Sequence, residues 1–461
     1  MFIRNFSHQY AFELDFAKKQ YFAHKAPAGK TLRSGNKKTI SFCESLSNIF
    51  LLLFFCQIDI RSIKLRQDEY MQTDIDYSDI RFYDDNDFPE VIKKLAYEPE
   101  MRRIVRFLLD GNILDEEVPS FLLSFKNIKD FQLNFIINVI KKVREVSVKE
   151  FTYSGIENVD YSEPHLFLTN HRNIVLDASF LNLALWENNA NEFKSTGIAI
   201  GDNLLTIPWV RDMARINKSF IVKRGLGVQQ MLESSKKLSN YIRDLITKDQ
   251  TSVWIASREG RTKDGNDITQ AGLLKMFQMS SSENFVENYS ELKILPVAIS
   301  YEFDPCDSDK VKELVTKLNK GKFEKGPMDD FISMFNGLMG EKGRVHYEFG
   351  KEITAVDLQA LDADVPKNEK IKHLADYLDD FYHQNYRLWP SNYIAADMLN
   401  ENTTFSDFYS QADYDYFEDM MNNRTKRIEG DAAQIKHIYL SMFAYPVKNH
   451  FKNDDNYSFK F

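Results

Sequence analysis

Short apolar runs alternate with longer amphipathic stretches between residues 166 and 300 of this 461-residue chain. The runs have the length of buried strands, while the stretches 175–187, 227–248 and 270–280 have helical spacing. This alternation predicts an α/β domain with a mostly parallel central sheet flanked by helices. The expected strands lie at 166–168, 197–200, 220–222, 253–256 and 294–299, with a later strand at 345–349.

Composition narrows the class of protein. Hydrophobic residues make up 43% and charged residues 28%, a balance typical of globular chains. The net charge of −9 argues against a dedicated nucleic-acid binder, whose domains are usually basic. Three cysteines at no regular spacing predict neither a disulfide framework nor a zinc site, so we expect a reducing compartment, no metal and no cofactor.

Helical patterns flank the α/β region on both sides. Residues 89–110 and 117–146 precede it, and the chain is helical again from about residue 366. We therefore expect an N-terminal helical region at 71–150, the α/β domain at 151–350 and a C-terminal helical region at 351–461. Two interpretations of 117–146 stay open, a helix packed on the core and an amphipathic helix touching lipid. Its apolar face comprises Leu133, Ile136, Ile137, Ile140 and Val143.

The first 70 residues differ in charge from the remainder of the chain. They hold 11 basic and 6 acidic side chains, while residues 71–461 hold 48 and 62, of 59 and 68 in total. We interpret 1–70 as an atypical basic extension that is either untranslated, with translation starting at Met71, or disordered. The apolar run 49–56 is too short to span a bilayer, which leaves a shallow membrane anchor as the alternative.

Segment 168–177 carries the first chemical signal. An apolar strand ends just before His171, and Asp177 follows within two helical turns. Open parallel sheets bind ligands at the carboxyl ends of their strands. A histidine held by a carboxylate can deprotonate a hydroxyl at neutral pH, which makes the two residues a candidate catalytic pair. A purely structural histidine is the competing interpretation.

Two further strands end in cations at the same expected edge. The strand at 220–222 is followed by Lys223 and Arg224, and the strand at 253–256 opens into a glycine-containing loop. Glycines let backbone N–H groups approach an anion, and guanidinium groups bind phosphate in a bidentate manner. An anion site is therefore predicted, with solvated surface cations as the alternative. The candidate binding residues of the loop are Glu259, Gly260, Arg261 and Lys263.

Taken in order, these segments and the run 295–300 resemble the glycerophosphate acyltransferase superfamily. That family has an Asn-His-x4-Asp block, a block ending Phe-Phe-Ile-x-Arg, a Glu-Gly-x-Arg block and a Val-Pro-Val block. The stretch Gly201-Asp202-Asn203-Leu204, with Ile207-Pro208, is similar to a signature of the glycerol-3-phosphate acyltransferase subgroup. The resemblance covers roughly residues 160–305 and implies an acyltransferase-like fold.

The chain departs from this pattern at two points. Five residues separate His171 from Asp177 where the family has four, so either a one-residue bulge restores the pair or the pair is broken. We expect the bulge, because turns between strands and helices absorb an extra residue easily. The third block can be aligned with the family in two ways. If Glu259-Gly260 matches the family Glu-Gly, Arg261 lies one position earlier than the family arginine. If Gly260-Arg261-Thr262-Lys263 matches the family Gly-Arg-Ser-Arg, Arg258 stands where the family has Glu.

The resemblance implies acyl transfer from an acyl thioester, either acyl-CoA or acyl carrier protein, to a hydroxyl of glycerol 3-phosphate or a related glycerophosphate in phospholipid biosynthesis. His171 would be the general base and Asp177 its orienting partner, with Arg224, Arg261 and the neighbouring lysines on the acceptor phosphate. The alternatives are a lysophosphatidate or aminolipid acceptor, or a catalytically silent lipid-binding homologue. Since the products are lipids, we expect a cytoplasmic protein attached peripherally to the membrane, by the 131–146 helix or the C-terminal aromatic segments 405–416 and 439–445.

Overall fold

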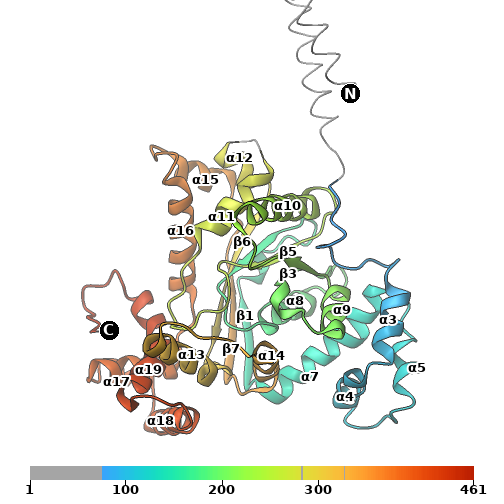
Figure 1. Cartoon of the computed structure of the whole chain (residues 1–461). Coiled ribbons are helices and arrows are strands. Elements are labelled where there is room, and N and C mark those ends of the chain that lie inside the picture. Colours follow the sequence, from blue (N-terminus) through green and yellow to red (C-terminus); the bar gives the residue numbers. More distant parts are fainter. Residues whose placement is uncertain (1–74, 282–283, 327, 461) are drawn as a thin grey trace, which may run out of the picture. The chain divides into compact units, whose positions relative to one another are not determined.

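The computed structural model describes residues 75–281, 284–326 and 328–460. The expectations for residues 1–70, including the start at Met71 and the apolar run 49–56, lie outside these residues. Residues 76–461 form one compact unit, shown in Figure 1 with its elements labelled. The description below concerns that unit.

A seven-stranded sheet with the order β1-β7-β6-β2-β5-β3-β4 is the centre of the described chain. The pairs β2–β5, β2–β6, β3–β4, β3–β5 and β1–β7 are parallel, and β6–β7 is antiparallel. The predicted α/β fold with a mostly parallel sheet is therefore confirmed. The strands are β1 (Glu150–Ser154), β2 (Leu166–Thr169), β3 (Gly197–Gly201), β4 (Ser219–Val222), β5 (Val253–Ala256), β6 (Ile294–Tyr301) and β7 (Arg344–Phe349).

One strand of the sheet, β1, was not predicted from the sequence. Its residues alternate polar and aromatic side chains instead of forming an apolar run, because it is an edge strand that pairs with β7 alone. The antiparallel pairing of β6 with β7 has a consequence for the site: the chain leaves β6 and re-enters β7 at the same edge of the sheet. Backbone bonds from Phe303 to Lys342 (3.0 Å) and from Glu302 to Arg344 (2.9 Å) close this excursion.

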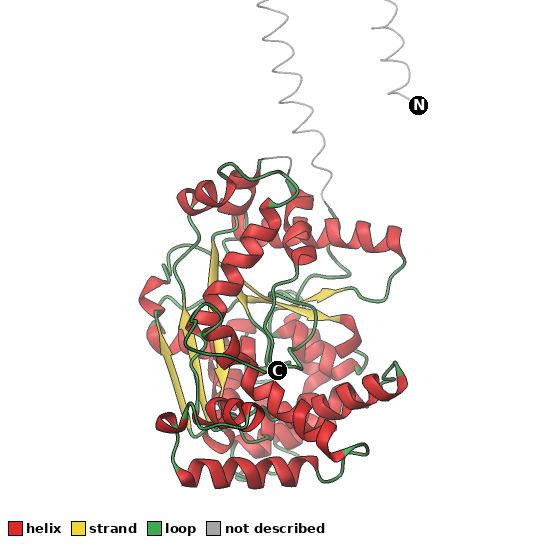
Figure 2. Cartoon of the chain, turned by 90° about the vertical axis from the view of Figure 1, so that its left-hand side faces the viewer, coloured by secondary structure: helices red, strands yellow, loops and turns green. Residues whose placement is uncertain are grey.

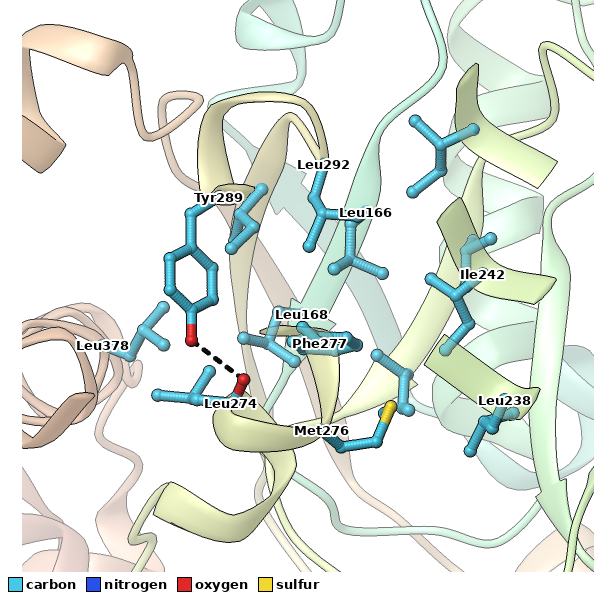
Figure 3. Packing of buried hydrophobic residues seen from close by; sticks show 14 of the residues in the cluster. Leu166, Leu168, Leu238, Ile242, Leu274, Met276, Phe277, Tyr289, Leu292 and Leu378 are labelled. Carbon is cyan, nitrogen blue, oxygen red and sulfur yellow. Dashed lines mark hydrogen bonds between the residues drawn. The ribbon is translucent and has the colours of Figure 1, made fainter. Parts of the chain in front are cut away.

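Helices cover both faces of the sheet (Figure 2). On one face, α10 and α16 enclose a core that includes Leu168, Phe277 and Leu378 (Figure 3). On the other face, α7 and α8 pack against Phe167 and Trp254. The helices of the α/β region are α7 (Ile137–Ser147), α8 (Leu176–Asn188), α9 (Pro208–Ile216), α10 (Val228–Thr247), α11 (Ala271–Phe277), α12 (Phe285–Ser290), α13 (Asp307–Lys320), α14 (Asp329–Met339), α15 (Ala355–Asp362) and α16 (Lys370–Asn385).

The single helix expected over 89–110 is two helices, α3 (Phe88–Ala96) and α4 (Pro99–Leu108). Glu98 is extended, with φ −72° and ψ 128°, because the residue before a proline disfavours the helical region. Pro99 then starts α4 at its first position, where no N–H is needed. The prediction of one continuous helix was therefore wrong at this proline.

The helix expected over 117–146 is also divided. It contains α5 (Val118–Leu122), α6 (Ile128–Phe131), a π-helical turn η1 (Gln132–Ile136) and then α7. The break lies at Asn127, whose side chain accepts a hydrogen bond from the backbone N–H of Asp130 and so begins a new helix. Along α7, Ile137, Ile140 and Val143 are buried in the core, so the interpretation of this face as lipid-touching is wrong.

The C-terminal region is helical as expected, with α17 (Pro390–Asn400), α18 (Gln411–Thr425) and α19 (Ala432–His450). In the two C-terminal aromatic segments, Phe405 and Tyr439 have 1% or less of their surface exposed and belong to a core with α13. Phe408 and Tyr416 of the first segment are 51% and 47% exposed, so its contact with a membrane stays a prediction. Within the described residues, no helix combines the length and apolar character needed to cross a bilayer.

Candidate active site

His171 lies directly beyond the carboxyl end of β2, and hydrogen bonds fix its backbone from both sides. The preceding Asn170 donates from Nδ2 to the carbonyl of Ile299 (3.0 Å) and accepts from the N–H of Ile299 (2.8 Å), which ties the end of β2 to β6. The carbonyl of His171 itself accepts from the N–H of Thr262 (2.9 Å). The loop after β5 is thereby joined to the histidine.

The side chains of His171 and Asp177 form a hydrogen bond. The distance from Nδ1 to Oδ2 is 2.9 Å, and the carboxylate is completely buried while 14% of the imidazole surface is exposed. The same Oδ2 accepts the backbone N–H groups of Arg172 (2.7 Å) and Asn173 (2.9 Å). The loop therefore curls around the carboxylate, and the five-residue spacing leaves the pair intact.

Asn173 explains how the loop takes up the extra residue. Its Oδ1 accepts the backbone N–H groups of Val175 and Leu176, both at 3.0 Å, and so satisfies donors at the start of α8. Asp177 then falls in the first turn of α8, where its charge is also favourable to the helix dipole. Local capping thus places the carboxylate opposite the imidazole.

Burial lowers the pKa of His171 below its usual value of 6.5, since the charged imidazolium loses solvation. Asp177 opposes this shift, while the positive charges of Arg261 and Lys310 add to it. An ionised carboxylate can only accept hydrogen bonds, so the neutral imidazole carries its proton on Nδ1. Nε2 has no hydrogen-bond partner in the described part of the chain, which leaves its lone pair available to accept a proton.

Among the predicted cations, Arg261 is the one whose charge contributes to the lowered pKa of His171. Its Nη2 donates to the hydroxyl of Ser333 in α14 (2.8 Å). Its Nη1 is buried and has no partner among the described residues. A half-buried guanidinium with one unused donor beside a general base is suited to hold an anionic group of a substrate.

Arg224 and Glu259 form a second predicted feature, an ion pair between the loops after β4 and β5. The distance from Nη1 to Oε1 is 2.9 Å, and two thirds of the Glu259 side chain is exposed. Gly201 makes room for Arg224, because a Cβ at this position would come within 2.5 Å of Nε. Gly260 adopts φ +71°, a left-handed conformation that a residue with a side chain rarely takes.

The two predicted lysines have different surroundings. Lys263 forms an ion pair with Glu313 of α13, so its ammonium group points to that helix. Burial lowers the pKa of Lys263, and Glu313 partly compensates. Lys223 is half-buried at the end of β4 and makes no hydrogen bond or ion pair with any described residue.

Several residues that organise the site were missed from the sequence. Asp267 accepts hydrogen bonds from Asn170 (3.0 Å), Arg172 and Thr262, and so joins the loops after β2 and β5. Lys310 of α13 is almost fully buried, forms an ion pair with Asp304 and donates to the carbonyl of Arg172 (3.4 Å). No sequence motif marks these residues. The one available signal is that Lys310 borders the apolar face of its helix, which includes Val311 and Val315.

No cluster of three or more metal-ligating side chains occurs among the residues that the structure describes. The site comprises one histidine–carboxylate pair, the half-buried Arg261 and two glycine-containing loops at the carboxyl edge of a mostly parallel sheet. This arrangement can move a proton beside a bound anion.

The comparison with protein-family models identifies the class of the central domain. The acyltransferase family model matches residues 150–300, so this part of the chain is an acyltransferase domain. No curated protein matches the chain. Among solved structures, the chain is similar to the crystal structure of the 1-acyl-sn-glycerophosphate (LPA) acyltransferase PlsC from Thermotoga maritima, with 11% identity over 64% of this chain and 92% of that one and a TM-score of 0.31.

Proposed function

We propose that this protein transfers a fatty acyl group from an acyl thioester, acyl-CoA or acyl carrier protein, to a hydroxyl of glycerol 3-phosphate or a related glycerophosphate. The observation that carries the proposal is the His171–Asp177 hydrogen bond of 2.9 Å, which leaves Nε2 unpaired within an acyltransferase domain. This hydrogen bond joins the two residues that the sequence resemblance implies as the catalytic pair.

In the proposed reaction, Nε2 of His171 accepts the proton of the acceptor hydroxyl as its oxygen attacks the thioester carbonyl. A tetrahedral intermediate forms, the carbon–sulfur bond then breaks, and the imidazolium returns the proton to the leaving thiolate. Asp177 keeps the Nδ1 proton in place and stabilises the transient positive charge on the ring. A lowered His171 pKa supports this role, because the base stays neutral at physiological pH.

The acceptor phosphate is proposed to bind Arg261 and Arg224, with Glu259 and Gly260 shaping the loop. Arg261 has a free donor, and Arg224 can exchange its half-exposed ion pair with Glu259 for a phosphate. Lys223 and Lys263 would add positive charge around this position. Lys263 must first leave Glu313, so its contribution is the smaller one in this scheme.

The decisive experiment is to incubate the purified chain with a labelled acyl-CoA or acyl carrier protein and a panel of acceptors. Acylation of glycerol 3-phosphate that is lost in His171→Ala would support the proposal. Acylation of lysophosphatidate or of an aminolipid alone would move the acceptor to that class. Thioester or lipid binding without any transfer by the unmodified chain would make it a silent lipid-binding homologue and overturn the proposed reaction.

Lipid products also bear on where the protein works. We propose that it acts at the cytoplasmic face of a membrane, attached peripherally to the surface. Extraction of the protein from membranes by salt would support this location, and a requirement for detergent would contradict it.

A further inference from the structure

The outer face of α14 carries an apolar stripe that no described part of the chain covers. Met328, Ile332, Phe335 and Met339 recur at intervals of four and three residues, which places them on one side of the helix. Their exposed fractions are 48, 48, 58 and 36%. Soluble proteins seldom leave so regular a stripe open to water unless it meets a partner.

The opposite face of α14 contacts the candidate active site. Ser333 accepts the hydrogen bond of Arg261, and the carbonyl of Gly337 accepts one from Asn173 (2.9 Å). A third bond joins Asn203 in the loop after β3 to Asp330 (3.1 Å). The helix labelled α14 in Figure 1 therefore contacts the site loops on the face opposite the exposed stripe.

Basic side chains accompany the stripe. Residues 317–326, which run from the end of α13 toward α14, hold four lysines and one glutamate, although the whole chain has a net charge of −9. Lys317, Lys320, Lys322 and Lys325 are all exposed. Three of them form ion pairs, Lys317 with Glu313, Lys322 with Glu324 and Lys325 with Asp330, and of the four only Lys320 has no ion pair with a described residue. Apolar side chains flanked by lysines are the combination that binds the surface of a membrane with anionic lipids.

We infer that α14 and the lysines of 317–325 form a docking surface for an anionic phospholipid membrane, with Ile332 and Phe335 entering the interface. This inference rests on the proposed function, because docking there would hold the site loops next to the layer that supplies lipid acceptors and receives lipid products. The charge complementarity favours this occupant over a second copy of the chain, since the lysines of two copies would repel each other.

The test is co-sedimentation of the full chain with vesicles of phosphatidylcholine alone and with vesicles containing equal parts of phosphatidylcholine and phosphatidylglycerol. We expect binding to the anionic vesicles that decreases with added salt. The Ile332→Asp/Phe335→Asp variant should bind at least about tenfold more weakly, because burying either side chain in an apolar phase favours binding by more than a factor of ten. The Lys320→Glu/Lys322→Glu variant should lose the preference for anionic vesicles.

The matched control is Leu114→Asp/Val356→Asp, which alters two apolar side chains that are 59% and 73% exposed elsewhere. It should bind as the unmodified chain does, and thermal unfolding should show that all variants fold. Failure of the unmodified chain to bind anionic vesicles, or equal binding by the Ile332→Asp/Phe335→Asp variant, would overturn the inference. A dimer in sedimentation equilibrium that this variant dissociates, without vesicle binding, would assign the stripe to a second copy instead.

These outcomes are separate from a failure of the proposed function, since vesicle binding is measured without substrates. Vesicle binding that depends on the stripe, in a chain that acylates no acceptor, would retain the docking surface and reject the reaction. Acylation of a water-soluble acceptor without vesicle binding would do the reverse.

Discussion

The imidazole of His171 and the carboxylate of Asp177 are hydrogen-bonded at 2.9 Å although five residues separate them in the chain. The intervening loop is organised around the carboxylate, whose Oδ2 also accepts the backbone N–H groups of Arg172 and Asn173. A carboxylate held by two backbone donors keeps its position when its third partner changes. The geometry of the pair is therefore determined by the loop and the first turn of α8 together.

Replacing His171 by alanine tests the base directly. We expect kcat to fall on the order of 10²–10⁴-fold, since one positioned general base contributes that much. The backbone bonds around His171 remain, so the thermal unfolding midpoint should change little. The assay follows thiol release from an acyl thioester in the presence of acceptor. Activity retained within threefold of the unmodified chain would contradict the assignment.

The pH dependence of kcat/KM should report the neutral form of His171. Because burial lowers its pKa, the fraction able to accept a proton declines only when the pH falls below 6.5, and the acid limb of the profile should lie below that value. Asp177 raises this pKa, so Asp177→Asn should move the limb to still lower pH. Its kcat should fall about 10²–10⁴-fold through loss of the correct tautomer. A limb that moves to higher pH would show that another group titrates.

Arg261 and Lys263 should differ when each is changed to alanine. Arg261 has a free buried donor, so Arg261→Ala should raise the acceptor KM about tenfold or more, since hydrogen bonds to charged groups contribute roughly 1.5–3 kcal/mol. Lys263 is engaged by Glu313, which would keep its second partner Lys317 (2.6 Å) in Lys263→Ala. The KM of that variant should change less. Equal effects of the two changes would argue against Arg261 as the principal phosphate ligand.

Gly337 tests the contact between α14 and the site loop. A Cβ at this position would come within 3.0 Å of Asn173, whose side chain is held by three hydrogen bonds. Gly337→Ala gains about 1 kcal/mol of helix propensity, which offsets part of the strain in unfolding measurements. We therefore expect kcat to decrease severalfold with little change in the free energy of unfolding. A variant with full activity would show that the Asn173 side chain can move away from the new methyl group without affecting catalysis.

The strands of the α/β region could be predicted because buried parallel strands read as apolar runs bounded by turns, as at 166–168 and 253–256. β1 could not, since its polar residues acquire their pairing only from β7, which is nearly 200 residues away in sequence. The helices at 89–110 and 117–146 were drawn too long because periodicity outweighed Pro99 and Asn127, both of which are recognisable breaks.

Within the site, His171 and Asp177 were accessible to sequence analysis because a strand end and a helix start place them locally. Asp267 and Lys310 were not, because their roles depend on loops and helices that only the folded chain brings together. The different roles of Arg261 and Lys263 could not be predicted from the sequence either. The difference is made by Ser333 and Glu313, which belong to helices outside the resemblance.

Because β6 and β7 pair antiparallel, the segment between them is inserted at one edge of the sheet. The segment departs from and returns to neighbouring strands, and the bond from Phe303 to Lys342 closes its base. Changes of length within this segment therefore leave the strand pairing unchanged, while they alter α14, the partner of Arg261 and the contacts of Lys310 and Gly337 with the His171 loop. Exchanging this segment in chimaeric proteins would therefore change the exposed stripe of α14 and the surroundings of Arg261 while the strands that carry His171 stay paired.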